Sequence, residues 1–193
     1  MQKLLILMIT ISTLLSCTDS PPSESSKNKS VQIDEGNIDN KTTNPNTMLN
    51  RLEFSIDIHA DKEKIWAALW DDQHYRDWSG TFGEGSYYVV QNWQQGGKIM
   101  FLSSDQTGIY SIIERYIPNQ VVQFKHVGNV VKGQEQPLDE ETKKWSGALE
   151  TYSLVAGSGY FTLLVEIDIL DQHVDFMSEK LPLALEKIKE NSR

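Results

Sequence analysis

The sequence has a single cysteine, Cys17, among its 193 residues, and this excludes an internal disulfide framework. Basic residues are also in the minority, because 18 Lys and Arg stand against 27 Asp and Glu, and the formal net charge is −9. Nucleic-acid binding depends on clustered Lys and Arg, and the sequence shows no basic stripe. The composition therefore argues against a nucleic-acid partner, and against binding to anionic lipid headgroups through charge.

Motifs for bound phosphates, covalent nucleophiles and zinc are missing as well. The sequence has no glycine-rich phosphate loop, no nucleophile motif and no zinc-ligand spacing. Two small groups of residues could suggest a metal site, namely Asp71, Asp72 and His74, and Asp171 with His173. Both groups stand where helices are expected to begin, and there Asp caps the helix and favours its dipole. We therefore expect neither a metal ion nor a cofactor.

Long apolar runs are scarce. The run over residues 4–15 is roughly a dozen residues long, whereas a helix across a bilayer needs about 20. It ends in Leu14-Leu15-Ser16-Cys17, which resembles the bacterial lipobox. The resemblance implies that residues 1–16 are a signal peptide and that the thiol of Cys17 carries lipid; the alternative is an ordinary signal peptide with a chance cysteine. Since two lipid chains anchor stably, we expect attachment to a membrane of the bacterial cell envelope, on the periplasmic side or surface-exposed.

Residues 17–50 differ sharply in composition from the rest of the chain. After Cys17 they are rich in Ser, Asn, Thr, Lys, Asp and Pro, and they contain almost no large apolar residue. Such a segment cannot bury enough apolar surface to offset its conformational entropy. We expect a disordered tether that leads to one folded domain over residues 51–193, which is long enough to build a core.

The composition pattern of the folded domain predicts the α+β class. Residues 51–59 alternate apolar and polar side chains, as a half-buried strand does, and short helices are predicted at 61–70 and 74–78. Turns rich in Gly, Pro, Asn and Asp then separate strands at hairpin spacing. These strands are expected at residues 86–92, 98–103, 108–116, 120–127, 145–155 and 160–169. The long acidic loop over residues 128–144 is of the kind that often forms a lid.

The C-terminal segment, residues 174–189, predicts a helix with one apolar stripe. Its apolar residues recur at steps of three and four, namely Val174, Met177, Leu181, Ala184, Leu185 and Ile188. We predict that a curved antiparallel sheet of about six to seven strands wraps around this helix. Pro182 lies inside it and should kink it, at a cost of about 3 kcal/mol.

Motifs in a fixed order cover essentially all of residues 51–193. The most specific is Lys144-Trp145-Ser146-Gly147-Ala148-Leu149-Glu150-Thr151-Tyr152-Ser153-Leu154. The others are residues 60–71 followed by His74 and Trp78, Trp93 with Gly96-Gly97-Lys98-Ile99 and Phe101, residues 113–119, residues 124–128 and residues 181–189. Together they resemble the START-like (SRPBCC) superfamily, in its activator-of-Hsp-ninety-ATPase-like branch.

This resemblance implies the helix-grip fold, in which the sheet curls round the last helix and leaves a cavity beneath it. It also implies that a proline is tolerated at Pro182, as a bend that lets the helix follow the sheet. The chaperone-activating members act in the cytosol on an ATP-driven partner. An export signal would take this chain to a compartment without ATP, so chaperone activation is not expected.

The resemblance places the side chains of His126, Glu150 and Tyr152 on the inner face of adjacent strands. They could orient a ligand in an apolar pocket, or they could form a hydrogen-bonded set that only satisfies itself in the core. Trp78, Trp93 and Trp145 could likewise line the cavity or fill the core. The candidate ligand-binding residues are Phe124, His126, Trp145, Glu150, Tyr152, Met177 and Leu181.

Three functions remain open from the sequence. The first, which we predict, is a membrane-anchored lipoprotein whose domain binds a small apolar or amphipathic molecule without catalysing a reaction. The second is an enzyme of the START-like kind that acts on a bound hydrophobic substrate. The third is a protein-interaction or chaperone-associated module that uses the outer surface of the sheet. A filled cavity would favour the third function, and an open cavity would favour the first two.

Overall fold

The computed structural model describes residues 49–193. The predictions for residues 1–48, which include the signal peptide, the lipidation of Cys17 and nearly all of the tether, lie outside the described residues. Within residues 49–193, no helix combines the length and the hydropathy that a membrane span requires.

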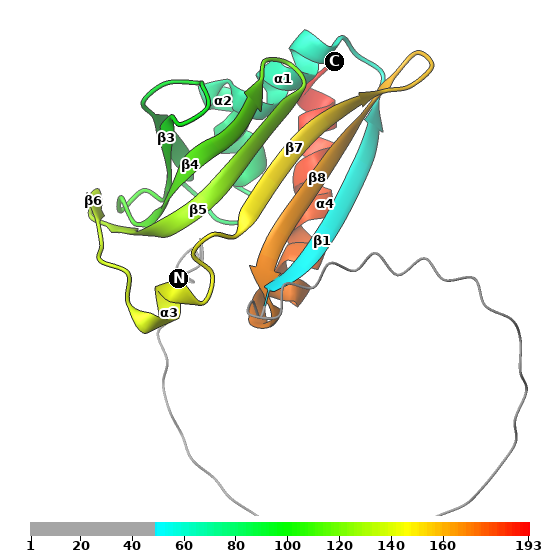
Figure 1. The fold of residues 1–193 in the computed structure, drawn as a ribbon. Helices are drawn as coiled ribbons and strands as arrows, with labels where there is room; N and C mark the ends of the chain where they lie inside the picture. Colours follow the sequence, from blue (N-terminus) through cyan, green and yellow to red (C-terminus); the bar gives the residue numbers. More distant parts are fainter. Residues whose placement is uncertain (1–48) are drawn as a thin grey trace, which may run out of the picture. The chain divides into compact units, whose positions relative to one another are not determined.

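The described chain folds into one antiparallel sheet with helices on its inner face (Figure 1). The elements in chain order are β1 (Leu49–Ile58), α1 (Lys62–Trp70), α2 (Asp72–Ser79), β2 (Tyr87–Val90), β3 (Lys98–Leu102), β4 (Gly108–Ile117), β5 (Val121–Val131), β6 (Gln134–Glu135), α3 (Glu140–Lys143), β7 (Leu149–Ala156), β8 (Phe161–Leu170), the 3-10 turn η1 (Asp171–His173) and α4 (Val174–Asn191).

The strand order is β1-β8-β7-β5-β4-β3-β2, with the short β6 paired to β5. Consecutive strands from β2 to β5 form hairpins. Strand β1 pairs with β8, the strand before α4, and forms the edge of the sheet opposite β2. Helix α4 lies behind β7, β8 and β1 in Figure 1, and α1 and α2 follow at its side. This is the predicted α+β helix-grip architecture, and the seven strands along the main path match the predicted number.

The core lies between the inner face of the sheet and the helices. Strand β5 shows the expected period of two, because Val122, Phe124 and His126 are buried while Gln123 and Lys125 are partly exposed. The apolar stripe of α4 also points inward, since Leu181, Leu185 and Ile188 are each at most 4 % exposed. Pro182 is inside α4 as predicted, on its exposed side, so the helix loses a hydrogen bond only where water can replace it.

One half of the core is built of aromatic rings around Trp70, the last residue of α1. Its indole lies within 6.4 Å, centroid to centroid, of seven other rings: Trp66, Tyr75, Trp78, Tyr88, Trp93, Phe124 and Tyr152. Most of these pairs are edge-to-face or tilted, the arrangement that aromatic quadrupoles favour. Trp93 belongs to this packed cluster, which makes it core filler rather than a residue of the cavity described below.

The segment 128–144, predicted as one long loop, is partly regular. Strand β5 continues to Val131, β6 pairs back onto it, and α3 follows, capped by the carboxylate of Asp139, which accepts a 2.8 Å hydrogen bond from the Thr142 backbone N–H. Strand β7 begins at Leu149 rather than at Trp145, because residues 145–148 form a turn. The predicted strand ended at Val127 because Gly128 and Asn129 resemble the start of a loop, but β5 continues through them to Val130 and Val131.

Candidate functional site

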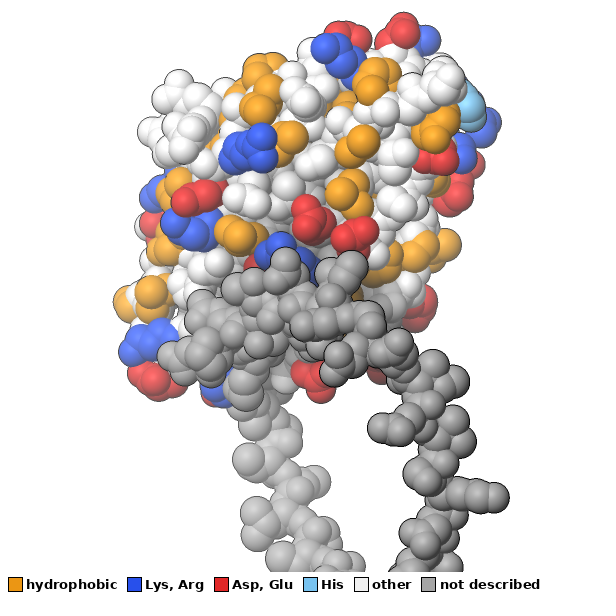
Figure 2. Space-filling model, turned by 45° about the vertical axis from the view of Figure 1, so that its right-hand side comes forward, with side chains coloured by type: hydrophobic (Ala, Val, Ile, Leu, Met, Phe, Trp, Pro, Cys, Tyr) orange, Lys and Arg blue, Asp and Glu red, His pale blue; other side chains and the backbone are white. Residues whose placement is uncertain are grey.

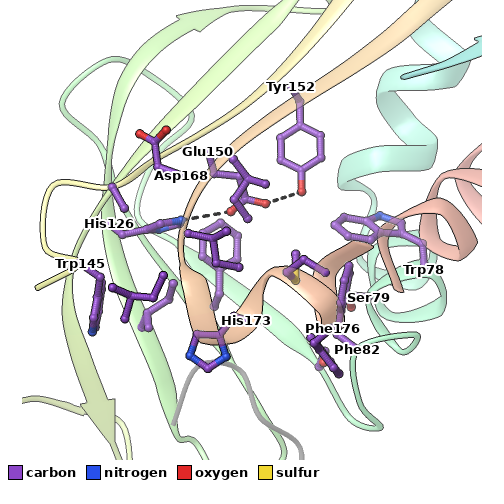
Figure 3. A pocket seen from close by; sticks show the side chains of 18 of the residues that line it. Trp78, Ser79, Phe82, His126, Trp145, Glu150, Tyr152, Asp168, His173 and Phe176 are labelled. Carbon is purple, nitrogen blue, oxygen red and sulfur yellow. Dashed lines mark hydrogen bonds and ion pairs between the residues drawn. The ribbon is translucent and has the colours of Figure 1, made fainter. Parts of the chain in front are cut away.

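A cavity of about 140 Å³ lies beneath the N-terminal part of α4, between that helix, α2 and the inner face of the sheet (Figure 3). Its lining is mostly aromatic and aliphatic, with a few polar groups. The lining residues are Trp70, Tyr75, Trp78, Ser79, Phe82, Ser86, Phe101, Ile109, His126, Trp145, Ala148, Glu150, Tyr152, Ile167, Asp168, Ile169, Leu170, His173, Phe176 and Met177.

The polar groups of the cavity centre on the carboxylate of Glu150. The Tyr152 hydroxyl donates a 2.6 Å hydrogen bond to Oε1, and Nε2 of His126 lies 3.3 Å from Oε2. Figure 3 shows His126 and Tyr152 reaching this carboxylate from opposite sides. Behind His126, the Oγ of Ser111 lies 2.8 Å from Nδ1, so that four side chains form one continuous network.

The hydrogen-bonding roles in this network depend on the tautomer of His126. When the ring carries its proton on Nε2, that nitrogen faces Glu150 and Nδ1 can accept from the Ser111 hydroxyl. Of the two carboxylate oxygens of Glu150, Oε1 accepts from Tyr152 and Oε2 faces Nε2 of His126. Burial, and after it the charge of Glu150, raises the pKa of Tyr152 well above its usual range, so this phenol stays protonated and keeps donating.

Strand pairing brings the network together. Glu150 of β7 pairs with Phe124 of β5, which places it diagonally across from His126, and His126 pairs with Ser111 of β4. Next to His126 the chain turns through residues 145–148, where the Gly147 N–H donates to the carbonyl of His126. Gly147 has a φ of +95°, a conformation that side chains disfavour, and this tight turn puts Trp145 at the cavity wall.

The cavity has a second acidic residue, but its carboxylate is already neutralised. Asp168 of β8 accepts two hydrogen bonds from the Arg51 guanidinium, at 2.7 and 3.0 Å, and a third from the Leu149 N–H. Figure 3 shows the Asp168 side chain directed away from the centre of the cavity. Glu150 is therefore the carboxylate that faces the cavity.

The half-exposed lining residues mark the entrance. Phe82 from the loop after α2, and Phe176 and Met177 from the first turns of α4, are partly exposed, and the rings of Phe82 and Phe176 lie 6.4 Å apart. His173 stands beside them, and burial lowers its pKa, which favours the neutral imidazole. The segment 128–144 was predicted to form a lid. This prediction is wrong for this cavity, because no residue of the segment lines it.

The structure brings together five of the seven residues that the sequence singled out. His126, Trp145, Glu150, Tyr152 and Met177 line the cavity. The other two do not. Phe124 is fully buried against Trp70 and Phe101, and Leu181 is 2 % exposed in the core. Of the tryptophans, Trp78 lines the cavity as well, and its indole N–H donates to the carbonyl of Leu69.

The residues proposed from sequence as weak metal candidates are spread over separate contacts. Asp72 pairs with Arg76, and one ring nitrogen of His74 faces the carbonyl of Ala67. Across residues 49–193, no group of three His, Cys, Asp or Glu side chains is arranged to hold a metal ion.

Several site residues escaped sequence reasoning. Ser111 did carry a signal, as a lone polar residue between Ile109 and Ile113 on the inward face of β4. Ser79 and Phe82 carried none, because they lie at the end of α2 and in the loop after it, where no periodicity applies. The Oγ of Ser79 is buried without a hydrogen-bond partner.

The described fold, with a cavity beneath its last helix, is of the helix-grip class. Among solved structures, the described fold is similar to the Aha1 dimer from Colwellia psychrerythraea, with 20 % identity, a TM-score of 0.52, and coverage of 73 % of this chain and 94 % of that one. It is also similar to MLL2253 from Mesorhizobium loti, with 12 % identity, a TM-score of 0.55, and coverage of 74 % and 96 %. CalU16 from Micromonospora echinospora is similar too, with 14 % identity, a TM-score of 0.51, and coverage of 75 % and 76 %.

Neither a protein-family model nor a curated protein sequence matches this chain. At 12–20 % identity, the similarity to solved structures shows a shared fold. Function therefore has to be argued from the cavity and its chemistry.

Proposed function

We propose that the domain over residues 49–193 binds a small, mostly apolar molecule with one polar end inside the cavity beneath α4. The observation that carries this proposal is the combination of a partly open, mostly apolar cavity with one convergent polar cluster. Ligand sites commonly have this composition, with apolar walls for affinity and a few polar groups for orientation. A domain that only needed a core would gain stability by filling such a space.

The direct test is to purify the protein under native conditions and weigh it by native mass spectrometry. A bound molecule should add a defined mass, and solvent extraction should release it for identification. Filling the cavity by Ala148→Leu should abolish the added mass. The matched control is Ala184→Leu, because Ala184 is equally buried but lies on the core stripe of α4, away from the cavity. If both variants retain the mass, the molecule is bound elsewhere.

Catalysis on the bound molecule is the second candidate, and one observation favours it. The imidazole of His126 and the carboxylate of Glu150 line the same cavity and lie 3.3 Å apart, close enough to exchange a proton with each other or with a bound group. If the protein is an enzyme, the wild type would contain product or nothing, whereas the inactive His126→Ala variant would retain unreacted substrate. Extracts from the wild type and from His126→Ala should therefore contain different molecules if the protein is an enzyme, and the same molecule if it is a binder.

A role as an interaction module has less support. The exposed large apolar side chains are Val89, Ile117, Leu138, Val155 and Leu183, and they come from five separate places in the described chain. Figure 2 shows hydrophobic side chains scattered between charges of both signs on the face in view. Protein-binding surfaces usually gather apolar side chains in one patch.

The export and anchoring of the chain also belong to this proposal, and the lipobox-like Leu14-Leu15-Ser16-Cys17 supports them. The protein would then hold its ligand at the surface of a membrane of the bacterial cell envelope. Cys17→Ser should move the protein from the membrane fraction to the soluble fraction and remove the lipid mass from its N-terminus. Membrane retention of the Cys17→Ser variant, with no lipid mass on the wild type, would contradict lipidation.

A further inference from the structure

We propose that the ligand is about the size of one aromatic ring and carries a hydroxyl or amino group rather than a carboxylate. This group donates a hydrogen bond to the carboxylate of Glu150. This inference rests on the proposed function, since it states which molecules the cavity accepts.

The size follows from the volume. A cavity of about 140 Å³ cannot enclose the long acyl chains of a lipid. In other proteins an apolar cavity of about 150 Å³ holds one benzene molecule. Five rings line the inner part of the space, and flat aromatic walls fit a flat ligand well. Those rings belong to Trp70, Tyr75, Trp78, Phe101 and Tyr152.

The preferred polar group of the ligand follows from how the hydrogen-bond donors of the cluster are used. The Tyr152 hydroxyl and Nε2 of His126 are both directed at Glu150, and Nδ1 of His126 is paired with Ser111. The two donors of the cluster that line the cavity, the Tyr152 hydroxyl and an Nε2–H of His126, are thus both directed at Glu150, and Ser111 does not line the cavity. A carboxylate can accept about four hydrogen bonds, and Glu150 receives one from Tyr152 and faces Nε2 of His126. The cluster therefore offers free acceptor capacity to a ligand and no free donor.

The charges around the cavity favour the same class of ligand. The lining contains two carboxylates, Glu150 and Asp168, and no Lys or Arg. The guanidinium of Arg51 is paired with Asp168, and the two acidic residues nearby, Asp171 in η1 and Asp175 in the first turn of α4, would repel an anion. A buried ligand carboxylate would lose its water without gaining a cation in return, and this is costly.

Two buried donors in the lining are unpaired, namely the indole N–H of Trp70 and the hydroxyl of Ser79. Both atoms have almost no accessible surface, so they do not open onto the cavity and a ligand there cannot use them. They therefore give no compensation for a buried ligand carboxylate.

The test compares four probes that share one ring: benzyl alcohol, benzylamine, benzoate and toluene. Binding to the full-length chain at pH 7 is followed by tryptophan fluorescence, because Trp70, Trp78 and Trp145 line the cavity. We expect benzyl alcohol and benzylamine to bind more tightly than toluene. Benzoate should bind roughly tenfold more weakly than benzyl alcohol, the scale for losing a hydrogen bond to a charged group.

The outcomes separate this inference from the function on which it rests. If all four probes bind equally, or if benzoate binds best, the cavity is a ligand site but the inference is wrong. If no probe binds at millimolar concentration, both the proposed function and the inference are wrong.

A charge-removing variant gives a second, independent readout. Glu150→Gln keeps the shape and an acceptor for Tyr152, and His126 can switch tautomer to accept from the new amide. The gap between benzyl alcohol and benzoate should shrink from roughly tenfold to less than about threefold. The matched control is Glu166→Gln, whose residue lies outside the lining, on the next strand, and it should leave the gap unchanged. An unchanged gap in Glu150→Gln would overturn the assignment to Glu150.

Discussion

The two halves of helix α4 face the same sheet but serve different purposes. In the C-terminal half, Leu181, Ala184, Leu185 and Ile188 are each at most 4 % exposed and pack in the core. In the N-terminal half, Phe176 and Met177 are only partly buried and stand beside a cavity of about 140 Å³. The difference arises from what lies opposite. Helix α2 is bound to the C-terminal half through Asp77, which contacts Lys187 and Asn191.

This contrast shows what an apolar stripe can and cannot reveal. The stripe tells which side of the helix turns inward, because its spacing follows the helical period. It does not tell whether the space beneath is filled, because the filling comes from α1, α2 and the strands. The packed half provides rigidity, and the open half leaves space for a ligand next to Glu150.

The largest expected effect concerns charge in the packed half. Leu181→Asp buries a carboxylate without a partner and should destabilise the domain by about 3–5 kcal/mol or prevent folding. Leu183→Asp is the matched control on the same helix, because Leu183 is 52 % exposed, and it should change stability by less than about 0.5 kcal/mol. Chemical denaturation of both variants measures this. Similar losses at the two positions would mean that the sheet does not grip the helix as described.

Truncation of apolar side chains should separate the two halves next. Leu181→Ala leaves a void in packed surroundings and should cost about 2–5 kcal/mol. Met177→Ala enlarges a space that is already open and partly exposed, so it should cost about 1 kcal/mol. Urea unfolding measures the free energy of unfolding of both variants, and the two values can be compared directly when their m-values are equal. A Met177→Ala loss as large as that of Leu181→Ala would show that the N-terminal half is packed core as well.

Enlarging a small residue should have opposite results in the two halves. Ala184→Leu overpacks the filled half and should cost about 1–3 kcal/mol. Ala148→Leu extends into the cavity, so its melting temperature should stay level or rise while benzyl alcohol no longer shifts it. Thermal unfolding with and without the probe measures both quantities. A large loss of stability in Ala148→Leu would mean that the cavity has no room for the added atoms.

A smaller effect should appear at alkaline pH. Burial raises the pKa of Tyr152, so the stability that this tyrosine contributes is complete below about pH 10. That stability is lost as the pH rises further, because the unfolded chain ionises its tyrosine while the folded chain does not. Above pH 10, Tyr152→Phe should make the fall in unfolding free energy with pH less steep, by at most about 1.4 kcal/mol per pH unit. Tyr75→Phe should act similarly, since burial also raises the pKa of Tyr75. Unchanged slopes in both variants would contradict this burial.

Most of the fold could be predicted from the sequence, because period-two and period-3.6 patterns report directly on local geometry. The α+β class, the sheet order of hairpins and the gripped helix all follow from such patterns and from the family resemblance. The inward direction of His126 and Tyr152 was also predictable, because the family resemblance implied it, and both residues are buried in the structure. The lid was wrongly assigned because loop length alone does not say which surface a loop covers.

The cavity itself could not be located in this way. Phe124 and Leu181 have the same apolar character as the true lining residues, and only the positions of Trp70 and α2 decide that they are enclosed. Ser79 and Phe82 reach the site from the end of α2 and the loop after it, far from the strands in sequence. Three-dimensional packing, rather than residue type, separates core from lining here.

The central claim is that one half of the space beneath α4 is filled and the other half takes a ligand. Methyl NMR during a benzyl alcohol titration tests it most directly. The methyl signals of Met177, Ile109 and Ile167, which line the cavity, should shift and saturate together. Those of Leu181, Leu185 and Ile188 should move far less, because they lie in the packed core. Equal shifts in both groups, or no shifts in the first group at saturating probe, would contradict the claim.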